Sequence, residues 1–106
     1  MSIYHLLDWH EGYAISTAIQ EVEQAVAQNK AVEVYIDDHD YFYEAYVSLN
    51  HRDVCSFGYE YLDGVARLFS NIDSHWTYHY STDQAVRRIL DHLEERKIIN
   101  NKGETA

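Results

Sequence analysis

The chain has few of the residues that interrupt or cross-link a fold: no proline, one cysteine and four glycines among 106 residues. Its single cysteine, Cys55, excludes an internal disulfide and a multi-cysteine zinc module, and it suits a reducing compartment. The longest apolar runs cover only a few residues, and no basic stretch leads into an apolar segment at the N-terminus. We therefore expect a cytoplasmic protein with no membrane span.

Basic side chains are also scarce. Eight lysines and arginines stand against 18 acidic residues, which gives a formal net charge of −10 with neutral histidines. The imbalance is strongest in residues 1–51, where Lys30 is the only basic residue. A chain of this sign is repelled by phosphate backbones, so we expect no direct binding to nucleic acid. An oppositely charged protein surface is the partner that such a charge attracts.

The sequence contains no catalytic motif, since both a G-x-S-x-G elbow and a glycine-rich phosphate loop are missing. Seven histidines raise the question of a metal. His75 and His79 lie in a segment that reads as a strand, which would separate them by about 13 Å at roughly 3.3 Å per residue. Cys55 lies on the apolar side of another expected strand and reads as a core residue. We expect no enzyme activity, no metal site and no cofactor.

The composition is that of a folded protein, with 46% hydrophobic and 14% aromatic residues, including ten tyrosines. A length near 100 residues fits one hydrophobic core. We therefore expect a single compact domain over residues 1–99, followed by a loose C-terminal tail over residues 100–106.

Two segments have the spacing of amphipathic helices. Residues 13–29 carry apolar side chains at every third or fourth position. A second helix is expected to start after Ser81, because Ser81 and Gln84 form a capping-box pattern, and to fray near Lys97. The short apolar segment 3–9 is either an opening strand or a lead-in to the first helix.

Between these helices the apolar residues alternate with polar ones, which is typical of half-buried strands. Asp63-Gly64 is the clearest turn signal, and the acidic stretch Asp37 to Asp40 is also expected to turn. Residues 65–70 fit a strand or a helical turn. The expected strands cover residues 32–36, 41–49, 55–61, 65–70 and 75–80.

The element order is therefore helix, three to five antiparallel strands, helix. Two amphipathic helices need an apolar surface, so the sequence predicts an α+β two-layer sandwich with both helices packed on one face of the sheet. This order resembles that of the double-stranded RNA-binding domain, which runs helix, three strands, helix. The basic lysines that the resemblance implies at the second helix are missing here.

If the helices cover one face, alternation places an aromatic and acidic set on the other. That set comprises Glu33, Tyr35, Asp37, Phe42, Glu44, Tyr46, Glu60, His75, Thr77 and His79. Aromatic side chains are enriched at binding interfaces because they bury a large area at a small entropic cost. The residues predicted to contact a partner are Glu33, Tyr35, Asp37, Asp38, Asp40, Tyr41, Tyr43, Glu44 and Tyr46. The competing interpretation is that the acidic stretch is only a well-solvated turn.

In size, charge and lack of a catalytic motif, the whole chain is similar to phage anti-CRISPR and antirestriction proteins and to the immunity partners of nuclease toxins. The resemblance implies a small acidic inhibitor that docks on a basic, nucleic-acid-binding surface of a nuclease or nucleoprotein complex, by mimicry of nucleic acid. Two alternatives remain. One is a non-catalytic assembly or adaptor subunit that forms a homodimer or larger homo-oligomer, and the other is a metal-dependent enzyme built from histidines and carboxylates.

Overall fold

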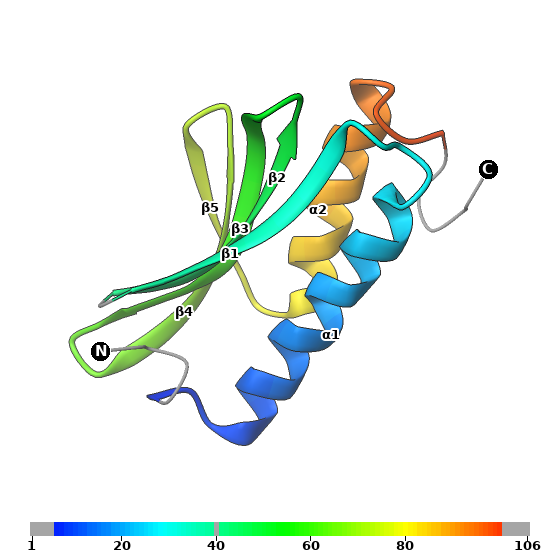
Figure 1. Cartoon of the computed structure of the whole chain (residues 1–106). Helices are drawn as coiled ribbons and strands as arrows, with labels where there is room; N and C mark the ends of the chain where they lie inside the picture. The colour runs from blue at the N-terminus through cyan, green and yellow to red at the C-terminus, as the bar shows by residue number, and fades with distance from the viewer. Residues whose placement is uncertain (1–5, 40, 101–106) are drawn as a thin grey trace.

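Five antiparallel strands form one sheet, and two helices cover one of its faces (Figure 1). The computed structural model describes residues 6–39 and 41–100. This arrangement confirms the α+β fold expected from the sequence, with all five strands present, two more than the resemblance to the RNA-binding domain implied. The elements are α1 (Trp9–Val26), β1 (Val32–His39), β2 (Phe42–Leu49), β3 (Arg52–Leu62), β4 (Val65–Ile72), β5 (His75–His79) and α2 (Thr82–Glu95).

Helix α1 begins four residues earlier than the apolar spacing predicted. The cause is a capping box: the Glu11 amide donates to Asp8 Oδ1 at 2.8 Å, and the Asp8 amide donates to Glu11 Oε1 at 2.9 Å. The described part of segment 3–9 is thus a lead-in to the helix, while residues 3–5 lie outside the described residues. Helix α2 begins as expected, with the Gln84 amide donating to Ser81 Oγ at 3.3 Å.

The sheet is a meander in which every strand pairs with its neighbour in sequence. Residues 65–70 belong to β4, so the strand interpretation of that segment is confirmed. Each of the last three hairpins turns through two residues with positive φ, namely Asn50-His51, Asp63-Gly64 and Asp73-Ser74. Two successive left-handed residues give a turn whose twist matches that of paired strands.

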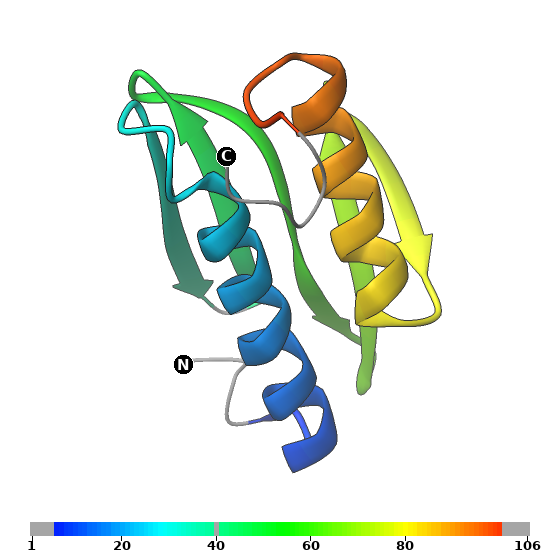
Figure 2. The ribbon, with the colours of Figure 1, turned by 90° about the vertical axis from the view of Figure 1, so that its right-hand side faces the viewer.

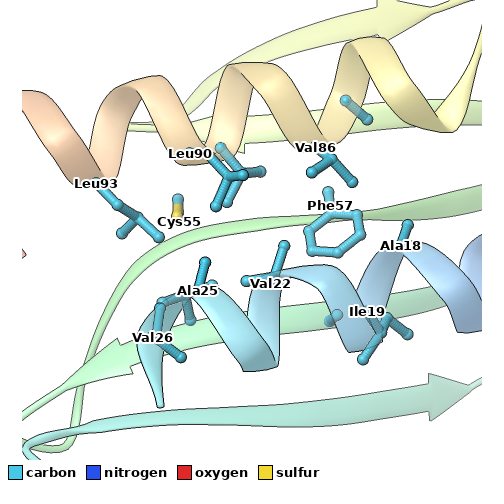
Figure 3. Packing of buried hydrophobic residues seen from close by; sticks show 14 of the residues in the cluster. Ala18, Ile19, Val22, Ala25, Val26, Cys55, Phe57, Val86, Leu90 and Leu93 are labelled. Carbon is cyan, nitrogen blue, oxygen red and sulfur yellow. The ribbon is translucent and has the colours of Figure 1, made fainter. Parts of the chain in front are cut away.

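The main hydrophobic core lies between the sheet and the helices, which lie side by side over it (Figure 2). Phe57 on β3 is fully buried between the helices, and Cys55 lies next along the same strand (Figure 3). Burial raises the pKa of the Cys55 thiol to about 12, so the thiol is inert and the interpretation of Cys55 as a core residue is confirmed. Within the described residues, neither helix has the length and apolar character needed to cross a bilayer.

Candidate functional site

The face of the sheet that points away from the helices is named here the open face. Alternation along the paired strands assigns its members, because side chains opposite one another in the register share a face. They are Glu33, Tyr35 and Asp37 of β1, Phe42, Glu44, Tyr46 and Ser48 of β2, Asp53, Ser56, Gly58, Glu60 and Leu62 of β3, Val65, Arg67, Phe69 and Asn71 of β4, and Trp76 and Tyr78 of β5.

Strand β5 presents the opposite side chains from those predicted. His75, Thr77 and His79 were expected on the open face, and that expectation is wrong. The register places Trp76 opposite Asn71 and Tyr78 opposite Phe69, whereas His79 lies opposite Leu68 of the core. Trp76 is held on the open face because its ring packs on Phe69, and the polar histidines therefore point to the other side.

A small aromatic cluster occupies the open face over β2, β4 and β5. The Trp76 ring lies 4.3 Å from the Phe69 ring between centroids, and the Phe42 ring lies 6.0 Å from Phe69 and 5.8 Å from Trp76. Phe69 is 0% exposed, although both described helices lie on the other side of the sheet. Trp76 keeps 45% of its surface exposed above it. The open face therefore has an apolar cluster of its own with an exposed aromatic cap.

Beside this cluster, tyrosine hydroxyls donate hydrogen bonds to carboxylates. Glu44 is only 4% exposed; its Oε1 accepts from the Tyr46 hydroxyl at 2.8 Å and its Oε2 accepts from Ser56 Oγ at 2.6 Å. The Tyr35 ring stacks on Tyr46 with centroids 5.1 Å apart, and its hydroxyl donates to Asp53 Oδ1 at 2.8 Å. These paired donors and acceptors fix the side chains of β1, β2 and β3 in one geometry.

A third pair extends the pattern to β5, where the Tyr78 hydroxyl donates to Glu60 Oε2 at 2.8 Å. The carboxylates also shift the tyrosine pKa values. Partial burial and the hydrogen bond to Asp53 raise the pKa of Tyr35 to about 12, and burial with the bond to Glu44 raises the pKa of Tyr46. The bond to Glu60 raises the pKa of Tyr78. All three hydroxyls therefore remain protonated donors at neutral pH.

This pairing predicts a loss of stability in alkali. A tyrosine whose pKa is higher in the folded state than its ordinary value of about 10 keeps its proton when the unfolded chain has lost it. The contribution of such a tyrosine to the free energy of unfolding is complete below pH 10 and is lost as the pH rises through the folded-state pKa. We expect the free energy of unfolding, measured in denaturant, to fall steadily above pH 10.

A tyrosine-to-phenylalanine substitution tests the cause. The Tyr46→Phe variant should lose less stability between neutral pH and pH 11 than the wild type, because it lacks one of the hydroxyls whose pKa is raised by folding. Tyr80 is 99% exposed, so Tyr80→Phe serves as the control and should follow the wild-type pH dependence. An alkaline loss of the same size in Tyr46→Phe and the wild type would contradict the assignment.

The structure brings together five of the nine residues predicted to contact a partner: Glu33, Tyr35, Asp37, Glu44 and Tyr46 share the open face. Asp38 pairs with Tyr43 on the opposite side, and Tyr43 packs against the main core. Tyr41 is exposed in the β1–β2 turn, and Asp40 lies outside the described residues.

Sequence reasoning missed the β5 side of this surface. Trp76 and Tyr78 were assigned to the other face, and the roles of Asp53, Phe69 and Asn71 were not predicted. The signal that was present is the Trp-Thr-Tyr alternation of β5 beside Phe69 of β4, because aromatic residues on neighbouring strands often pair across a sheet.

Carboxylates dominate the charge of the open face. Glu33, Asp37, Glu44, Asp53 and Glu60 lie on it, and Asp53 also accepts the hydrogen bond from Tyr35. Arg67 is the one arginine or lysine among the described residues assigned to this face. Because the tyrosine protons already point at carboxylates, the surface is left with mainly acceptor atoms and negative charge.

The catalytic possibilities are few in the part of the chain that the structure describes. No group of three or more His, Cys, Asp or Glu side chains there is placed to hold a metal ion. Ser70 Oγ lies 2.8 Å from His79 Nε2, which is the distance of a nucleophile and its base. Ser70 is only 1% exposed, however, so a substrate has no access to the hydroxyl. Burial lowers the pKa of His79, which keeps the imidazole neutral in this structural hydrogen bond.

Comparisons with known proteins supply no relative for this surface. No protein-family model matches the chain, and no curated protein or solved structure gives a significant match.

Proposed function

We propose that the protein is a stoichiometric inhibitor that docks its open face on a basic, nucleic-acid-binding surface of a partner enzyme. The observation that carries this proposal is the pairing of tyrosine hydroxyls with carboxylates across β1, β2, β3 and β5. The pairing uses the tyrosine donors of the face and leaves mainly acceptors and negative charge for the partner. A partner must therefore bring donors and positive charge, which arginine and lysine side chains supply.

Nucleic-acid-binding enzymes carry such surfaces because their substrate is a polyanion. In this proposal the carboxylates of the sheet imitate the phosphates of that substrate, while the exposed part of Trp76 contributes apolar contact. The hydrogen-bonded side chains are ordered before binding, which lowers the entropic cost of association. The inhibitor and the nucleic acid then compete for one surface, as in the anti-CRISPR, antirestriction and immunity proteins that the chain resembles in size and charge.

The test is capture of the partner with variants that change charge at matched positions. The open-face variant is Glu33→Gln, Asp37→Asn, Glu60→Gln. The control variant is Glu21→Gln, Glu23→Gln, Glu95→Gln, which removes three exposed carboxylates from the helices and so has the same net charge. Each immobilised protein is exposed to host lysate and eluted with a salt gradient, and the eluate is identified by mass spectrometry.

We expect the wild type and the control variant to retain a basic nuclease or nucleoprotein complex that double-stranded DNA releases. The open-face variant should lose it at low salt, because charge steers association most strongly there. Retention by the open-face variant, or failure of DNA to compete, would exclude this mode of inhibition. Recovery of copies of the chain alone would instead favour the homo-oligomeric adaptor.

A further inference from the structure

A cavity of about 220 Å³ lies at the end of the open face beside the β4–β5 turn. We name it the Asn71 cavity. It is bounded on one side by Tyr46 of β2 and on the other by the turn at Asp73 and Ser74. Its walls are formed by Tyr46, Asp53, Val54, Cys55, Ser56, Asn71, Asp73 and Ser74. The cavity is distinct from the aromatic cluster but lies on the same face.

The walls of this cavity are rich in hydrogen-bond acceptors. Asp53 and Asp73 contribute two carboxylates, and none of the described residues that line the cavity is basic. The Asn71 Oδ1 atom is buried and has no hydrogen-bond partner among the described residues. A buried acceptor without a donor is costly, which marks the Asn71 amide as an unsatisfied polar group in the wall of the cavity.

A buried carboxylate lies directly behind the wall. Glu44 accepts from Ser56, which lines the cavity, and its two hydroxyl donors are both neutral. A carboxylate with 4% exposure carries its charge into a region where water screens it poorly. Its field therefore adds to those of Asp53 and Asp73 inside the cavity.

We propose that the Asn71 cavity is a socket for an arginine side chain of the partner, an inference that rests on the proposed docking of the open face. A guanidinium group is permanently charged and presents five donors in a plane, which matches acceptors spread around the walls. Its flat surface stacks on an aromatic ring, and Tyr46 supplies one at the wall. A lysine ammonium has three donors and no flat surface, and it fits this arrangement less well.

The socket is tested with a small probe that needs no partner. N-acetylarginine methylamide is titrated into the isotope-labelled protein and followed by NMR, beside its lysine and citrulline counterparts. The arginine probe should cause saturable shifts in the Asn71 side-chain amide and in the backbone amides of Asp53 and Ser74. The lysine probe should bind more weakly, and the neutral citrulline probe should cause no saturable shift.

Conservative variants locate the site. In Asp53→Asn an amide oxygen still accepts the Tyr35 bond, and in Asp73→Asn an asparagine tolerates the φ of 53° at this turn, so both variants keep the fold. The double variant should weaken binding of the arginine probe by about tenfold or more, since two ion pairs become hydrogen bonds to neutral amides. Asp83→Asn on α2 removes one exposed charge outside the cavity and should leave binding unchanged.

Equal shifts with citrulline and arginine, shifts confined to other residues, or full binding by the double variant would each overturn the socket. If the probe gives one of these results while the open-face variant still fails to capture the partner, the socket is rejected and the docking proposal stands. Conversely, probe binding in the socket with partner capture unaffected by the open-face variant would reject the docking proposal alone.

Discussion

Replacing Gly58 with alanine is expected to destabilise the protein by about 3 kcal/mol or more, which is near the upper range for overpacking a buried site. A Cβ atom at this position would overlap the Tyr43 carbonyl oxygen and would lie 2.8 Å from the Glu44 Cα. Both are backbone atoms of the neighbouring strand β2, so no side chain can rotate away. The substitution must push β2 from β3 at the centre of the sheet.

Gly64 provides the matched control for this change. It has a φ of +77° in the β3–β4 turn, but an added Cβ would meet nothing within 4 Å. Gly64→Ala therefore carries only the backbone strain of a left-handed alanine, about 1–2 kcal/mol. Chemical denaturation of the two variants should give a clearly larger loss for Gly58→Ala. Equal losses would show that β2 does not approach β3 as closely as described.

The second large effect is expected from Phe69→Ala, which removes the buried ring of the open-face cluster. Truncating a fully buried phenylalanine lowers the free energy of unfolding by about 3–5 kcal/mol. We expect the lower value for Phe69→Ala, because the open-face cluster is small and lies close to solvent. Trp76 would lose the ring on which it packs, so its fluorescence should shift to that of a more hydrated indole. This second readout distinguishes collapse of the open face from damage to the main core.

The measurement is best made in a Trp9→Phe background. Trp9 is 72% exposed and is the other tryptophan of the chain, so its replacement leaves Trp76 as the reporter at little cost. Phe57→Ala, in the core under the helices, is the comparison: it should lower stability by a similar amount with little change in Trp76 emission of the folded protein. An unchanged stability or emission in Phe69→Ala would contradict the existence of a separate cluster.

The helices and strands were largely predictable because their burial has a regular period. Apolar residues recur every three to four positions in residues 13–29 and 82–97, and they alternate with polar residues in the strand segments. These two patterns identify two amphipathic helices and a sheet with one apolar face, which together define the fold. The start of α1 was missed because segment 3–9 was interpreted from its apolar residues alone, and the capping-box pattern of Asp8 and Glu11 was not considered. Such a boundary is set by two side-chain hydrogen bonds and not by hydrophobic spacing.

The candidate site was predictable on β1 and β2 but not on β5. In β5 the sequence interpretation directed the aromatic side chains toward the helices, because it assumed that the protein has a single hydrophobic core. The structure has a second, smaller one: Phe69 is buried on the open face and holds Trp76 there. The tyrosine–carboxylate bonds were also beyond sequence reasoning, because they depend on the strand register, including the irregularity between Val47 and Ser48 that sets Asp53 near Tyr35.

The order of the strands has a consequence for how the chain reaches its folded state. Because each strand pairs only with the one before and after it, the sheet is assembled from four successive hairpins, and no strand waits for a distant segment. The chain also contains no proline, so no slow X–Pro isomerisation interrupts this assembly. The remaining step that joins distant parts of the sequence is the docking of α1 against α2 and the sheet, so we expect this contact to form late in folding.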